Sequence, residues 1–189
     1  ESAPTVTLTS SASSVAENGS ALTLTATLSG ATDEAVTVGI STSGTGTEGT
    51  DYVTVSDITI AAGATTGTTS FTLSDDSAYE DDETAIIAIA TVSGGGGSGA
   101  TENGTQAVTI TITENDSGPT VTLTSSASSI AENAGSSLTL TATLSAATVA
   151  DVTVTFSYTG TATRNGTDYA NVSNIVISAG DTTGTASFT

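Results

Sequence analysis

Apolar residues alternate with threonine, serine and other polar residues along most of the chain. Val6 and Leu8 alternate with threonines, and residues 22–28 and 36–40 continue the pattern. A period of two puts apolar side chains on one face of a strand and polar side chains on the other. Turn-forming residues such as Ser29-Gly30 separate the runs, and no helical period is present. The pattern predicts an all-β, Ig-like antiparallel β-sandwich of about seven strands. Further short runs lie at 53–55, 58–60, 71–73, 87–89 and 108–112.

The chain repeats itself with an offset of 115 residues at the start and 117 at the end. Residues 4–18 return almost unchanged at 119–133, and 67–72 return at 184–189. A period of this size is one Ig-sized domain. We therefore expect tandem repeats, with a complete sandwich over 1–118 and the first half of a second over 119–189. That half would be truncated, or completed by strands from another chain.

Charge narrows the possible partners. The net charge is −19, with one basic residue and no histidine. Nothing would neutralise phosphates, so neither nucleic acid nor an anionic membrane surface is an expected partner. No apolar run is long enough to span a membrane, so we expect no membrane insertion. Catalysis is also not expected, because histidine, cysteine and lysine are absent and aromatic platforms for a glycosidase are few.

An acidic cluster at 75–83 interrupts the Thr-rich sequence. It concentrates carboxylates between two strand-like runs. Hard cations with oxygen ligands, calcium above all, would relieve their repulsion. A solvated acidic loop is the other interpretation of such a run.

Several motifs together resemble the Calx-beta family, found in sodium/calcium exchanger regulatory loops, integrin β4 and large bacterial surface proteins. They occur in the family's order over 4–116, and the first half recurs over 119–189. The motifs are Val15-Ala16-Glu17-Asn18, Gly49-Thr50-Asp51-Tyr52, residues 61–67, the acidic cluster and Ile112-Thr113-Glu114-Asn115-Asp116.

The resemblance implies calcium ligands at one pole of the sandwich. These would be Glu17, Asp75, Asp76, Glu80, Glu83, Glu114 and Asp116, with Glu132 as the counterpart of Glu17. One further ligand position corresponds to Ser43, and the closing acidic run contains Asn115, which implies fewer ions or weaker binding. Asp51 and Asp168 are expected instead to cap turns through backbone hydrogen bonds. Tyr52 and Tyr169 are expected to pack on the sandwich, and Asp81 and Asp82 to face water.

The expected function is that of a calcium-binding structural module in an extracellular or cell-surface adhesion or fibre protein. Calcium at the inter-repeat pole would stiffen the rod, and the partners would be calcium ions, adjacent repeats or copies of the chain. The alternatives are a calcium-sensing regulatory domain and a filament subunit assembled by strand complementation.

Overall fold

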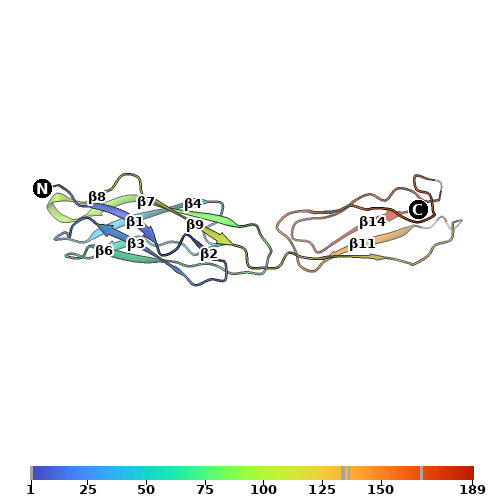
Figure 1. Cartoon of the computed structure of the whole chain (residues 1–189), viewed down its shortest axis with the longest axis horizontal. Coiled ribbons are helices and arrows are strands. Elements are labelled where there is room, and N and C mark those ends of the chain that lie inside the picture. Colours follow the sequence, from blue (N-terminus) through green and yellow to red (C-terminus); the bar gives the residue numbers. More distant parts are fainter. Residues whose placement is uncertain (1, 133–134, 136, 167) are drawn as a thin grey trace. The chain divides into compact units, whose positions relative to one another are not determined.

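The computed structural model describes residues 2–132, 135, 137–166 and 168–189 (Figure 1). Their contacts form two compact units, Glu1–Asp76 with Asp81–Asn115, and Ser77–Glu80 with Asp116–Thr189. Strands dominate both units, and one 3-10 turn occupies Gly96–Ser98. Within the described residues, no helix has the length and apolar character needed to cross a membrane.

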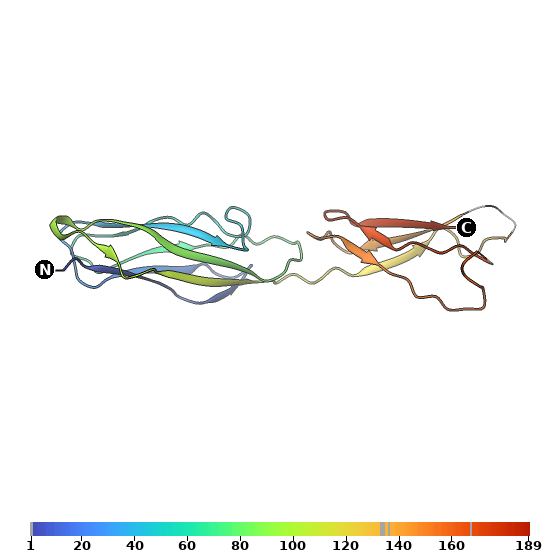
Figure 2. The same cartoon turned by 90° about the horizontal axis from the view of Figure 1, so that it is seen from above.

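The first unit is a sandwich of two sheets (Figures 1 and 2). Its long pairings are antiparallel, whereas the short pairings β1–β8 and β2–β9 are parallel. The predicted all-β sandwich is therefore confirmed. One sheet has the order β6 (Thr66–Phe71), β3 (Leu22–Leu28), β1 (Thr5–Ser10) and β8 (Thr101–Glu102). The other has the order β2 (Ser14–Ala16), β9 (Ala107–Thr113), β7 (Glu83–Gly94), β4 (Val36–Gly44) and β5 (Ile58–Ile60).

The register of β1 and β3 explains their alternating sequence. Val6 lies opposite Leu28 on the buried face, and Thr7 lies opposite Thr27 on the other. The Thr7 hydroxyl donates to the Thr27 carbonyl at 3.4 Å. A slip of one residue would move every apolar side chain to the opposite face, so the burial of this face fixes the register.

Both sheets contribute to the core of the first unit. Tyr52 and Phe71 are its largest fully buried side chains, and their ring centroids lie 5.0 Å apart. Tyr52 is 1% exposed, which confirms that it packs on the sandwich. Ile87 of β7 and Ile110 of β9 close the core from the other sheet.

The prediction of a strand at 53–55 is wrong. Val53 is 52% exposed and Val55 is buried, but the segment lies outside the named strands. Instead, the Val53 amide donates to the Thr72 carbonyl, and Tyr52 forms an isolated bridge with Leu73. Alternation alone does not make a strand where only a short bridge supplies backbone partners.

The second unit repeats part of this arrangement. A three-stranded sheet has the order β10 (Val121–Ser125), β11 (Leu138–Leu144) and β14 (Thr183–Phe188). A two-stranded sheet pairs β12 (Val152–Val154) with β13 (Ile175–Ile177). Its core contains Ala142, Leu144, Ile175, Ile177 and Ala186.

Candidate metal centre

Two strand ends bring the first group of acidic residues together. β2 and β9 run parallel with Ala16 opposite Thr113, and the Glu17 amide donates to the Thr113 carbonyl at 3.0 Å. Glu17 follows β2 and Glu114 follows β9, so this register places them beside each other. Asp116 follows two residues later, and we call Glu17, Glu114 and Asp116 the Glu17 cluster.

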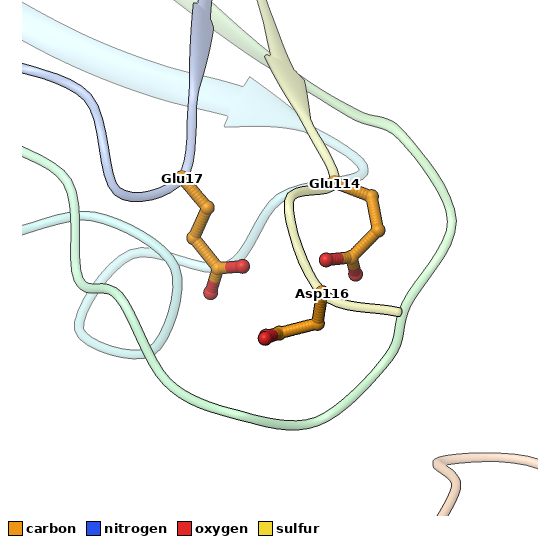
Figure 3. A group of neighbouring side chains, drawn as sticks. All are labelled: Glu17, Glu114 and Asp116. Atoms are coloured by element: carbon orange, nitrogen blue, oxygen red, sulfur yellow. The ribbon is translucent and has the colours of Figure 1, made fainter. Parts of the chain in front are cut away.

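The geometry of the Glu17 cluster suits a calcium ion. Figure 3 shows the three carboxylates turned toward a common space, and one oxygen of each lies within 4.8 Å of the others. Calcium binds oxygens at about 2.4 Å, so ligands on opposite sides of one ion lie about 4.8 Å apart. Glu17 is only 6% exposed. A carboxylate removed from water in this way needs compensation by hydrogen bonds or a counter-ion.

Asn115 connects the loops around this cluster. Its Oδ1 accepts from the Asn18 amide at 3.0 Å, and its Nδ2 donates to Asp75 Oδ1 at 3.5 Å. The amide side chain both accepts and donates here, which an aspartate could not do. Asp82 is exposed, as expected, but its Oδ1 also accepts from the Glu114 amide at 3.0 Å. Asn115 and Asp82 therefore hold the backbone that carries the cluster.

Asp51, Glu80 and Glu83 form a second group, which we call the Asp51 cluster. One carboxylate oxygen of each lies within 4.8 Å of the others, and Asp51 is 8% exposed. Asp51 Oδ2 also accepts from the Thr47 amide, which confirms the predicted turn cap. Sequence reasoning missed that the same side chain joins an acidic group. The sequence feature that could have indicated this is the Gly-Thr-Asp-Tyr motif, which contains Asp51 and is one of the motifs of the family resemblance.

Backbone contacts fix the loop that presents Asp51. The Gly46 amide donates to the Thr84 carbonyl at 3.0 Å, and the Thr84 amide donates to Thr45 Oγ1 at 2.8 Å. The Ser74 amide donates to the Asp51 carbonyl at 2.9 Å. The two bonds to Thr84 tie the loop to the start of β7, where Glu83 is the first residue, and the bond from Ser74 ties it to the segment after β6.

The remaining predicted ligands lie outside both groups as far as the described residues show. Asp75, Asp76 and Glu132 are exposed, and neither acidic group includes them. Asn133, which follows Glu132, lies outside the described residues. Ser43 is exposed on β4, and the third acidic residue beside Glu80 and Glu83 is Asp51.

The chain has almost no positively charged side chains that could neutralise these carboxylates. Its single basic residue, Arg164, places its guanidinium 4.4 Å from the Tyr158 ring centroid in the second unit. Elsewhere, hydrogen bonds from Thr42 and Thr54 lower the pKa of Glu48. Clustered carboxylates without a basic side chain favour an external cation.

Comparisons with known structures show moderate likeness. The apo form of the Calx CBD1 domain is 21% identical, with a TM-score of 0.49, covering 59% of this chain and 99% of that one. The calcium-binding domain CBD12 of CALX1.1 is 21% identical, with a TM-score of 0.48, covering 95% and 74%. A two-domain protein from Bacteroides fragilis is 11% identical, with a TM-score of 0.45, covering 80% and 69%.

Sequence comparison identifies the family. No curated protein sequence matches the chain. The Calx-beta domain model matches residues 1–116 and again residues 114–185. Calx-beta domains are calcium-binding regulatory and structural domains rather than catalytic ones. Because the two matches span nearly all of the sequence, this chain belongs to the Calx-beta family.

Proposed function

We propose that this chain is a calcium-binding structural module of an extracellular, multi-repeat surface or adhesion protein. The observation that carries the proposal is the convergence of Glu17, Glu114 and Asp116, with oxygens within 4.8 Å of one another. Two facts support calcium as the ion. The chain belongs to the Calx-beta family, and a ligand set made only of oxygens suits a hard cation.

Calcium bound at the Glu17 cluster would restrain the segment that leads to the second repeat. Glu114 and Asp116 lie within residues 113–119, where Pro119 already restricts the backbone. An ion held by both residues and by Glu17 fixes the start of this segment to the β2 end. Repulsion among the carboxylates loosens the same segment when calcium is removed.

The modest calcium affinity that we expect of these clusters agrees with an extracellular setting. Each cluster brings three carboxylate oxygens together, one from each residue, and calcium takes six to eight oxygens. Backbone carbonyls and water complete such a shell, and extracellular modules of modest affinity bind in the range of about 0.1–1 mM. The absence of methionine and cysteine also suits long exposure to an oxidising environment.

Thermal unfolding of the chain in calcium, magnesium and chelator tests the ion. A ligand that binds only the folded state raises the unfolding midpoint. We expect a calcium-specific rise that Glu17→Gln reduces. Glu34→Gln is the matched control, because Glu34 is exposed and belongs to neither cluster. Equal midpoints in all three buffers would reject the metal function.

Distance measurements test the stiffening. The chain has no native cysteine, so Thr59→Cys on β5 and Val176→Cys on β13 give one spin-label pair at exposed positions. Calcium should narrow the distribution of distances between the labels. A distribution that is equally broad in chelator and in calcium would reject stiffening. A shift between two narrow distributions would instead favour the calcium-sensing alternative.

A further inference from the structure

The chain contains asparagine–glycine pairs at 18–19, 103–104 and 165–166. Glycine has no side chain, so its amide nitrogen can approach the side-chain carbonyl carbon of the preceding asparagine closely. Attack of the nitrogen on that carbon closes a succinimide ring and expels ammonia. Each pair therefore carries its own nucleophile and electrophile, and the local fold decides whether the two can meet.

Hydrogen bonds hold the glycine nitrogen in two of these pairs. The Gly19 amide donates to the Ala16 carbonyl at 2.7 Å, and the Gly166 amide donates to the Tyr169 carbonyl at 2.9 Å. An amide in such a bond loses its proton only after the bond opens, as in hydrogen exchange. The Gly104 amide has no hydrogen-bond partner among the residues that the structure describes.

The space around the glycine also differs between the pairs. A Cβ added at Gly19 would lie 2.6 Å from Val15 Cγ2 and 2.7 Å from the Ala16 carbonyl oxygen. A Cβ added at Gly104 would meet no other atom within 4 Å, so a ring can form there without a clash. Asn103 and Gly104 are both exposed, and solvent supplies the base that removes the amide proton and the water that opens the ring.

We propose that Asn103 is a site of spontaneous deamidation. The Gly104 nitrogen gives its proton to solvent base and bonds to Asn103 Cγ, while the bond from Cγ to Nδ2 breaks and ammonia leaves with a proton from water. Water then opens the succinimide. Attack at Cγ gives aspartate, and attack at the main-chain carbonyl carbon gives isoaspartate. One water is consumed for each ammonia released, and nothing is oxidised or reduced. The reaction involves neither acidic cluster and does not depend on the proposed function.

Isoaspartate at this position would disturb the turn that joins β8 to β1. The Asn103 amide donates to the Val6 carbonyl at 3.0 Å, and Gln106 Nε2 donates to the Asn103 carbonyl at 2.7 Å. Gln106 Oε1 in turn accepts from the Leu8 amide at 3.4 Å. An isoaspartyl link carries the main chain through Cβ and Cγ, and it turns the carbonyl that Gln106 binds into a free carboxylate. Deamidation at Asn103 therefore loosens β8 from the edge of its sheet.

Peptide mapping of the full chain during incubation in mildly alkaline buffer tests the proposal. Cleavage after glutamate places Asn103 and Asn18 on separate peptides with no other asparagine, and fragmentation of the peptide after Glu132 locates Asn165. In the folded chain Asn103 should deamidate about two- to tenfold faster than Asn165, since one hydrogen bond holds the nitrogen of the latter pair. The difference from Asn18 should be larger, because crowding adds to the hydrogen bond there. Both aspartate and isoaspartate should form at position 103.

The matched control is the same chain in denaturant, where the pairs should react at similar rates because no fold restrains them. Equal rates in the folded chain, or slower reaction at Asn103 than at another pair, would overturn the proposal. Aspartate without isoaspartate would also overturn it, because direct attack of water on the side-chain amide gives aspartate alone. A preference for Asn103 that persists in denaturant would do the same, since the local sequence and not the fold would then set the rate. Faster reaction at Asn103 with both products, lost in denaturant, supports it.

Discussion

At the scale of single residues, Asp51 combines a structural and a chemical role. Its Oδ2 closes a turn by accepting the Thr47 amide, and its carboxylate also lies beside Glu80 and Glu83. The second repeat separates the two roles. Asp168 accepts the Thr163 amide in the same way, but residues 119–189 contain no counterpart of Glu80 or Glu83.

Asparagine substitution at the two positions separates the roles in an experiment. An asparagine oxygen can still accept the turn hydrogen bond but carries no charge for an ion. We expect Asp51→Asn to weaken calcium binding about tenfold or more, because a charged ligand is lost. Asp168→Asn should leave the affinity unchanged. Calorimetric titration of both variants measures this, and equal affinities would show that Asp51 serves the turn alone.

At the scale of elements, period-two patterns predicted strands wherever a ladder supplies backbone partners. Residues 22–28 became β3, along which burial alternates as the pattern requires, and residues 36–40 became part of β4. In β4 the alternation of burial holds over residues 36–38 and ends where the register shifts between Gly39 and Ile40. The pattern failed at 53–55, where the backbone partners are isolated bonds. The pattern also could not reveal that β1 and β2 belong to different sheets, since the sheet that a strand joins is decided by partner strands far away in the sequence.

The same limit explains what sequence could and could not predict of the site. Glu17 and Glu114 lie far apart in the chain, and only the parallel β2–β9 register brings them together. No local pattern encodes that register, so only the family resemblance could predict that Glu17 and Glu114 lie close together. The place of Asp51 in the second acidic group was missed because a turn cap already explained why an aspartate stands at that position.

Gly44 at the end of β4 tests the pairing that supports the Asp51 cluster. Its φ is 122°, and a Cβ would lie 2.1 Å from the Thr84 carbonyl oxygen. We expect Gly44→Ala to lower the free energy of unfolding by about 2–4 kcal/mol, through strain and the clash with backbone. Denaturant titration measures the change.

Gly30→Ala is the matched control, because a Cβ added there would meet no other atom within 4 Å and the backbone is not left-handed. Its effect should stay within about 0.5 kcal/mol. Similar values for the two variants would mean that β4 and β7 can separate at this end without loss.

At the scale of the whole molecule, the charge of −19 makes the folded chain sensitive to ions of every kind. Folding concentrates carboxylates that lie farther apart in the unfolded chain, so self-repulsion opposes the compact state. Monovalent salt screens this repulsion, since the Debye length falls from about 30 Å at 0.01 M to about 3 Å at 1 M.

In chelator, sodium chloride should therefore raise the unfolding midpoint by a few degrees, most steeply at low concentration. In calcium the same salt should raise the midpoint less, because screening also weakens the attraction between the ion and its carboxylates. Potassium chloride should act like sodium chloride, whereas sucrose of equal osmolality should not reproduce the steep rise at low concentration. A midpoint that does not change with salt in chelator would show that repulsion among the carboxylates, clustered or scattered, does not oppose folding at this net charge.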